Sequence, residues 1–171
     1  NGKYIAICDG DDYWIDSNKL QLQIDYMEAN PLCTLSTHAV LIKDITNKKK
    51  GKIQPAKISK RISTEEIIAG GGNFLGTNSL VFPKNIVSNL PKWYYKAKVG
   101  DYPLQIYCAS KGYTYYFNKT MSIYRYAVPG SWSVRNQSNG QIINDQIENM
   151  LNDLNTYYDF KYSDAVNIAK E

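Results

Sequence analysis

The amino-acid sequence predicts an α/β domain, and three observations lead to this prediction. Short apolar runs rich in β-forming residues alternate with segments whose apolar residues recur at helical spacing. The chain has 171 residues, which is enough to enclose a hydrophobic core. Its composition, 43% hydrophobic and 21% charged, is typical of a folded globular protein and excludes a disordered one.

The first half of the chain predicts two strands and two helices in alternation. An apolar run that stops abruptly at acids is typical of a buried strand, and a Ser-Thr-Glu-Glu sequence is typical of a capped helix start. The predicted elements are a strand at residues 3–8, a helix from Asp16-Ser17 to Asn30-Pro31, a strand at 32–42 and a helix from Ser63 to the glycines 70–72.

The second half predicts a similar alternation that ends in helices. The strongest helical signal lies between Ile142 and Leu154, where apolar residues form one continuous stripe. The predicted elements are a strand at 73–82, a short helix at 83–90, a helix from about 99 to Gly112, strands within 113–126, a loop at 130–140, the helix at 142–154 and a last helix from Ser163. We therefore divide the chain into a main unit, residues 1–135, and a C-terminal helical extension, residues 136–171, that packs on it.

An acidic turn, Asp9-Gly10-Asp11-Asp12, follows the first predicted strand. Three adjacent carboxylates repel one another and contribute nothing to a core, whereas ligands of open α/β sheets bind at this end of a strand. Mg²⁺ and Mn²⁺ favour oxygen ligands, often one or two carboxylates together with substrate phosphates. The acidic turn is therefore a candidate site for a divalent metal and a phosphorylated ligand. The alternative is an ordinary Asp-Gly turn with a helix cap.

Two other classes of metal-dependent protein also have closely spaced acids, and the spacing of residues along the chain excludes one of them. An EF-hand loop that began at Asp9 would need Gly and Glu where Trp14 and Leu20 stand, so this class is excluded. A phosphatase that forms an aspartyl phosphate also places such acids after a strand, and it remains an alternative. A zinc site and His-based nucleophilic catalysis are disfavoured, because His38 is the only histidine and no Cys-x-x-Cys pair occurs.

A second acid, Asp101, lies between Gly100 and Pro103 at the start of a predicted helix. An acid in this position often only caps the helix. Its aromatic surroundings also suit a carboxylate that acts as a general base at the wall of a cleft.

Two further segments have compositions that suit sugar binding. Residues 70–79 are rich in glycine, asparagine, threonine and serine, which permit close approach and bond to hydroxyl groups. The Tyr124-Arg125 pair and the Gly130-Ser131-Trp132-Ser133 segment add aromatic faces on which a sugar ring could stack. The alternatives are a flexible turn for the first segment and core packing for the aromatic residues.

Taken in this order, the motifs resemble the second half of a family-2 glycosyltransferase of the GT-A fold, from Lys3 to about Ser133. The resemblance implies a partial GT-A fold, with a mixed sheet flanked by helices and a helical C-terminus. The matching residues are Asp9-x-Asp11-Asp12-x-Trp14 with Lys19-Leu20, then Asn73-Phe74-x-Gly76-Thr77-x-Ser79, then Asp101-Tyr102-Pro103-Leu104 with Lys111-Gly112 and Tyr115-Tyr116, and finally Met121-Ser122-x-Tyr124-Arg125 with residues 130–133.

The resemblance implies an inverting glycosyltransferase. It would move a sugar from a nucleotide-diphosphate sugar to a glycan or lipid-linked acceptor in bacterial surface polysaccharide biosynthesis. Asp11 and Asp9 would hold Mn²⁺ or Mg²⁺, and Asp101 would be the catalytic base. We expect the substrates to contact Asp12, Trp14, Gly76, Thr77, Asn78, Arg125 and Trp132.

The sequence departs from the family pattern in three ways. Gly100 stands where many members have an acid beside the base, and Ala127 stands where many have histidine. The family's first half, which holds the nucleoside, would precede Asn1. We therefore expect the chain alone to transfer sugar poorly or not at all. We also expect the strand at 3–8 to have a free edge or to be covered by self-association. A non-catalytic carbohydrate-binding module remains another alternative.

The charge distribution suggests a membrane partner more than a nucleic acid. The net charge of +4 arises largely from residues 43–61, including Lys48-Lys49-Lys50-Gly51-Lys52, with no accompanying nucleic-acid-binding motif. The alternative for this segment is a solvated hairpin tip, but it could also contact anionic lipid head groups. The three cysteines have unrelated spacings and apolar neighbours, which predicts buried free thiols in a reducing compartment. We expect a cytoplasmic protein, at the inner face of the membrane where it meets a lipid-linked acceptor.

Overall fold

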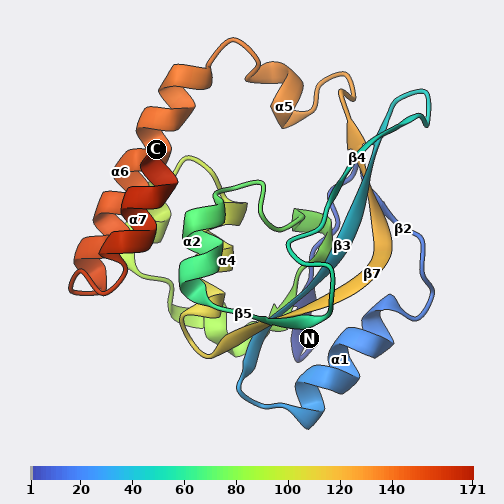
Figure 1. Ribbon diagram of the computed structural model, residues 1–171, viewed down its shortest axis with the longest axis horizontal. Coiled ribbons are helices and arrows are strands. Elements are labelled where there is room, and N and C mark those ends of the chain that lie inside the picture. The colour runs from blue at the N-terminus through green and yellow to red at the C-terminus, as the bar shows by residue number, and fades with distance from the viewer. Residues whose placement is uncertain (1) are drawn as a thin grey trace.

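Two long strands, β3 (Cys33–Asp44) and β7 (Tyr113–Tyr126), run parallel to each other at the centre of the sheet (Figure 1). The computed structural model describes residues 2–171. The strand order is β1-β6-β3-β7-β2, with β4 added to β3 and β5 added to β7, and all pairs except β3–β7 are antiparallel. The predicted α/β class with a mixed sheet and flanking helices is confirmed.

The remaining elements connect and cover these strands. The short strands are β1 (Tyr4–Ala6), β2 (Tyr13–Trp14), β4 (Lys49–Ile53), β5 (Lys60–Ile62) and β6 (Val81–Pro83). The helices are α1 (Lys19–Ala29), α2 (Thr64–Gly70), α3 (Lys92–Lys96), α4 (Asp101–Ala109), α5 (Trp132–Arg135), α6 (Gly140–Tyr157) and α7 (Ser163–Lys170), with 3₁₀ turns η1 (Thr77–Ser79) and η2 (Lys84–Asn89).

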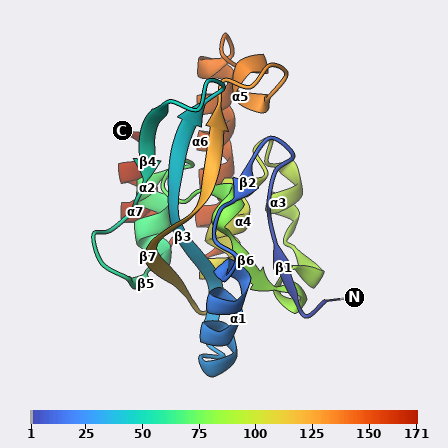
Figure 2. The ribbon, with the colours of Figure 1, turned by 90° about the vertical axis from the view of Figure 1, so that its right-hand side faces the viewer.

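The main core lies between the sheet and the group α2, α4, α6 and α7, while α1 lies on the other side of the sheet (Figures 1 and 2). Helix α4 is the centre of the larger layer, since its residues 102–109 are all buried. Helices α6 and α7 contribute Leu154 and Val166 to the same core. Met27 of α1 packs with Cys33 and Val81 in a smaller cluster. No helix within residues 2–171 is long and apolar enough to cross a membrane.

Local sequence signals explain several elements well. The predicted capping box of α2 is present, with Ser63 accepting a hydrogen bond from the Glu66 amide and Glu66 bonding back to Ser63. The predicted helices from Asp16-Ser17 and from Ser163, and the predicted strand at 32–42, correspond to α1, α7 and β3. The segment rich in lysine forms a hairpin of β3 and β4. Strand β1 ends the row of strands with one edge unpaired by any strand of residues 2–171, as expected.

Other sequence predictions were wrong in extent or kind. The predicted strand at 73–82 is mostly irregular, because Asn78 and Ser79 turn their buried side chains to bonds with distant segments. The strand at 3–8 is only Tyr4–Ala6. By contrast, the short helix predicted at 83–90 is present as the 3₁₀ helix η2, Lys84–Asn89. The predicted loop at 130–140 contains α5. Cys8 is exposed, whereas Cys33 and Cys108 are buried as predicted.

The turn between α4 and β7 requires glycine at position 112. A Cβ atom there would lie 2.2 Å from the backbone oxygen of Leu32, which accepts a 3.1 Å hydrogen bond from the Tyr113 amide. We predict that Gly112→Ala lowers the free energy of unfolding by about 1–3 kcal/mol in urea denaturation, because backbone has to move. Gly140→Ala is the matched control, since a Cβ atom there meets nothing within 4 Å. Equal urea midpoints for the two variants would contradict this view of the turn.

Candidate active site

The acidic turn and Asp101 are brought together by residues 76–78. The Thr77 hydroxyl donates a 2.6 Å hydrogen bond to Oδ2 of Asp101, and the next residue, Asn78, donates a 2.8 Å bond from its amide to Oδ2 of Asp12. Segments that are distant in sequence thus form one acidic site.

Asn78 is the buried centre of this arrangement, with only 1% of its surface exposed. Its side-chain amide also bonds to the Ile123 carbonyl at 3.1 Å, and its side-chain oxygen accepts a 2.8 Å bond from Ser122. Its backbone oxygen accepts a 2.9 Å bond from the Trp14 indole. Asn78 therefore fixes β7, β2 and the acidic turn relative to one another.

Asp12 is anchored on both carboxylate oxygens. Besides the bond from Asn78, its Oδ1 accepts a 3.0 Å hydrogen bond from the Arg125 amide. The Arg125 guanidinium donates a hydrogen bond to the Asp11 carbonyl. Arg125 therefore holds the acidic turn with both its backbone amide and its side chain. Burial and, to a lesser extent, the charges of Asp11 and Asp9 raise the pKa of Asp12 to about 6. The hydrogen bonds from Arg125 and Asn78 lower it and so oppose part of this rise. These contacts make Asp12 a residue that positions the turn.

Asp9 and Asp11, by contrast, present carboxylates that no group of the described residues engages. Within residues 2–171, neither side chain accepts a hydrogen bond or pairs with a basic residue. Loss of contact with water raises the pKa of Asp9, and the charges of Asp11 and Asp101 raise it further. Mutually repelling acids without a cation are typical of functional sites, because a protein gains no stability from them.

Asp101 is the first residue of α4, at the edge of the buried core. Its Oδ1 accepts a 2.8 Å hydrogen bond from the Tyr102 amide, and its Oδ2 accepts the bond from Thr77. These two bonds fix the plane of the carboxylate. The Tyr102 side chain is fully buried and bonds to the Ile68 carbonyl, which fixes the start of the helix.

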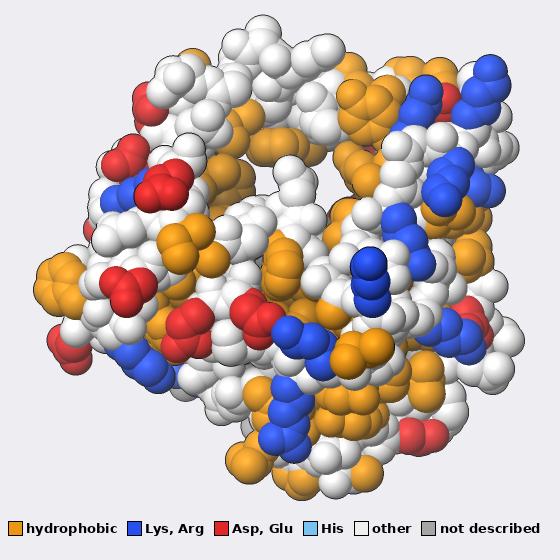
Figure 3. All heavy atoms as spheres, viewed as in Figure 1, with side chains coloured by type: hydrophobic (Ala, Val, Ile, Leu, Met, Phe, Trp, Pro, Cys, Tyr) orange, Lys and Arg blue, Asp and Glu red, His pale blue; other side chains and the backbone are white. Residues whose placement is uncertain are grey.

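The other predicted site residues have different surroundings. Gly76 is buried, and a Cβ atom there would lie 2.6 Å from Val40, so glycine is required beside Thr77. Trp132 is 51% exposed on α5, and its indole makes no hydrogen bond to the acidic turn within residues 2–171. Figure 2 nevertheless shows α5 at the same end of the molecule as the loop between β1 and β2. Figure 3 shows a hollow bordered by the α5 segment.

Sequence reasoning missed a buried polar group behind Asn78. Lys19 is 1% exposed, donates a 2.8 Å bond to Gln23, and lies 4.3 Å from the Trp14 ring centroid. Gln23 in turn bonds to the Ser79 carbonyl at 2.9 Å. Burial lowers the pKa of Lys19 to about 8. The available signal was the pair of polar residues four apart on the helix face that packs on the sheet.

His38 belongs to the structural part of this region. It is 1% exposed, its Nδ1 lies 2.9 Å from the Ala39 carbonyl, and burial lowers its pKa to about 3. Within residues 2–171, no group of three or more His, Cys, Asp and Glu side chains is arranged to hold a metal unaided. A surface cavity of about 730 Å³ beside Lys3, Glu28 and Lys84 is lined by none of the candidate site residues.

Comparison with known proteins identifies similar proteins whose names state no function. No family model matches the chain. It is 30% identical over 132 residues to a protein of Mycobacterium bovis and to proteins of two strains of Mycobacterium tuberculosis, whose names describe each as an uncharacterized protein. The match covers 77% of this chain and 37% of each relative, so the chain spans little more than a third of their length.

The central role of Asn78 predicts a pH-dependent loss of stability in Asn78→Asp. The substitution places a second carboxylate against that of Asp12, so the folded state binds protons more tightly than the unfolded state. The stability of the variant should therefore fall as pH rises. Relative to the wild type, we expect its free energy of unfolding to be lower by on the order of 3 kcal/mol near neutral pH, and by less near pH 4. Urea denaturation at both pH values measures this, with Asn139→Asp, at the start of α6, as the control. A penalty independent of pH would contradict the assigned contact.

Proposed function

We propose that the chain is the acceptor and metal half of an inverting glycosyltransferase with a GT-A fold. The observation that carries this proposal is the joining of Asp101 to the acidic turn through Thr77 and Asn78. A transferase needs a base for the acceptor hydroxyl close to the group that holds the departing diphosphate. The two parts of the candidate site match these two requirements, and the order of the motifs along the chain supports the same function.

Asp9 and Asp11 are suited to a divalent cation. Their carboxylates accept no hydrogen bond from the residues described, which leaves oxygen atoms available. Mg²⁺ is often held by one or two carboxylates with phosphate oxygens completing the set, and Mn²⁺ also favours oxygen ligands. When bound, the cation would neutralise charge on the diphosphate leaving group. Asp12 does not need to bind the cation, since its role is to hold the turn.

Asp101 has the geometry of a positioned base. The Thr77 hydroxyl and the Tyr102 amide each occupy one lone pair, and each carboxylate oxygen keeps another. In the proposed reaction the acceptor hydroxyl oxygen bonds to the anomeric carbon while the bond from that carbon to the diphosphate breaks. The hydroxyl proton passes to the Asp101 carboxylate. Attack from the face opposite the leaving group inverts the anomeric configuration.

Exposed aromatic residues favour a carbohydrate-binding module as a second candidate. Trp132 is 51% exposed and Tyr126 is 48% exposed, and both rings could stack on sugars without any catalysis. This function does not explain why two neighbouring acids, Asp9 and Asp11, pair with no basic residue within the described part of the chain. A phosphatase would use Asp9 as the nucleophile, but the buried lysine nearby is bonded to Gln23 rather than directed at the turn.

The deciding experiment measures Mn²⁺-dependent binding of inorganic pyrophosphate by calorimetry. Pyrophosphate is used because the diphosphate is the part of the donor assigned to the acidic turn. We predict that the double variant Asp9→Asn, Asp11→Asn weakens binding by at least about tenfold, because two anionic ligands are lost. Asp101→Asn should retain most of the binding, since residue 101 is assigned to the acceptor.

Asp145→Asn combined with Asp153→Asn is the matched control, with the same change of charge on α6, which lies on the opposite side of the molecule from β2 (Figure 1). Equal binding by the wild type and the Asp9/Asp11 variant would overturn the proposal. Hydrolysis of p-nitrophenyl phosphate that is lost on Asp9→Asn would favour the phosphatase instead. Glycan binding that needs Trp132 and persists in the Asp9/Asp11 variant without any metal would favour the binding module.

A further inference from the structure

The hairpin of β3 and β4 projects a concentrated positive charge from one end of the sheet. Residues 43–53 contain five lysines and one acid, Asp44. Figure 3 shows Lys and Arg side chains grouped along this hairpin. The hairpin therefore carries an excess positive charge equal to the net charge of +4 of the whole chain.

The one acid of the hairpin is used to build its turn. Oδ1 of Asp44 accepts bonds from the Thr46 amide and hydroxyl and from the Lys48 amide, at 2.7–3.0 Å. Its Oδ2 pairs with Lys50 at 3.2 Å. Within residues 2–171, Lys43, Lys48, Lys49 and Lys52 pair with no acid. Four ammonium groups are therefore available to an anionic partner.

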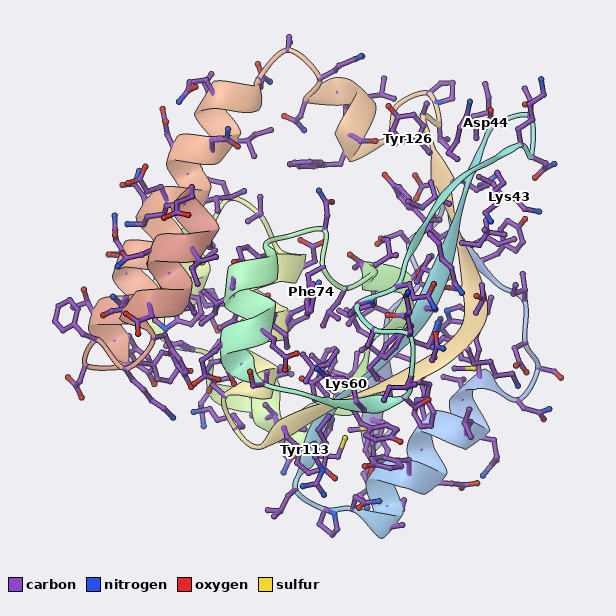
Figure 4. The ribbon with its side chains drawn as sticks, in the orientation of Figure 1. Lys43, Asp44, Lys60, Phe74, Tyr113 and Tyr126 are labelled. Atoms are coloured by element: carbon purple, nitrogen blue, oxygen red, sulfur yellow. The ribbon has the colours of Figure 1, made fainter. Side chains whose placement is uncertain are left out.

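Apolar side chains lie at the same tip. Ile45 is 60% exposed in the turn, and Tyr126, which is opposite Asp44 in the β3–β7 register, is 48% exposed. Figure 4 shows Asp44 and Tyr126 near each other at this end of the sheet, with Lys43 beside them. Lysines on an edge strand can serve simply to prevent aggregation. That role does not explain exposed Ile45 and Tyr126, which would promote aggregation.

The lysine-rich tip of the β3–β4 hairpin and the candidate active site lie at the same end of strands β3 and β7. Lys43 is opposite Arg125 in the β3–β7 register, and Arg125 holds Asp11 and Asp12. Figures 1 and 2 both show the hairpin tip and α5 at the same end of the molecule. A surface that contacted the hairpin would therefore lie beside the acidic site.

We propose that the β3–β4 hairpin docks this chain on an anionic lipid bilayer, with Ile45 and Tyr126 entering the head-group region. The lysines supply attraction to anionic lipids, and the apolar pair adds burial in the interface. A flat anionic surface suits the mixture of charge and exposed apolar residues better than a nucleic acid does. That docking would bring the candidate active site to a lipid-linked acceptor rests on the proposed function, but the docking itself does not.

Vesicle co-sedimentation tests this proposal. The wild type should bind vesicles rich in phosphatidylglycerol and not vesicles of phosphatidylcholine, and added salt should weaken the binding. Each lysine near an anionic surface contributes about a fivefold factor, so replacing Lys48, Lys49 and Lys52 by Gln should weaken binding on the order of 100-fold. Replacing Lys84, Lys92 and Lys161 by Gln is the control with equal charge, and it should have little effect.

A second variant tests the insertion of the tip. Ile45→Trp lies in an exposed turn, so it should leave the fold intact. Its fluorescence, after subtraction of the wild-type signal, should shift to the blue when phosphatidylglycerol vesicles are added. Equal vesicle binding by the two lysine triple variants would overturn the proposal. So would binding to single-stranded RNA without binding to vesicles, or an emission from the introduced indole that does not change.

The outcomes separate this proposal from the proposed function. Vesicle binding by a chain that fails to bind Mn²⁺ and pyrophosphate would leave the docking surface standing without the transferase. Pyrophosphate binding without vesicle binding would leave the transferase standing and remove the docking surface.

Discussion

The hydrogen bonds of the buried Asn78 side chain determine the geometry of the whole candidate site. One amide group joins the acidic turn to β7, and the backbone of the same residue holds the Trp14 indole. Because Thr77 is the preceding residue, its bond to Asp101 adds α4 to the same assembly. An unsatisfied buried amide is costly, so the protein can keep this residue only if all these partners are in place. The irregular backbone around η1 follows from that requirement.

The acids of the site divide into those that hold structure and those that remain available. Asp12 is bonded to Asn78 and Arg125, while the side chains of Asp9 and Asp11 accept no bond from the residues described. The raised pKa values of Asp9 and Asp12 reflect partial loss of contact with water and mutual repulsion, and a bound cation would relieve the repulsion. The protein thus uses one carboxylate to fix the position of two others. This division supports a site for a cationic complex more than a structural turn.

The sequence predicted well those features that depend on local chemistry. The capping box of α2 and the helix signal of α6 follow from side-chain patterns within one or two turns. The stretch 73–82 was mispredicted because its conformation depends on bonds to residues more than forty positions away. The candidate site residues could be predicted from their residue types and their order along the chain. The sequence could not predict that Asp12 anchors the turn or that Lys19 is buried, since both depend on packing between segments far apart in the chain.

The central claim is that a divalent cation held by Asp9 and Asp11 lies in one site with residues 76–78 and the start of α4. Paramagnetic broadening of backbone amide signals by Mn²⁺ with pyrophosphate tests it most directly, because broadening falls steeply with distance from the ion. The claim predicts strong broadening at Gly10, Thr77 and Tyr102 in the same titration, with α7 unaffected. Broadening confined to the acidic turn, or centred on any other part of the chain, would contradict it.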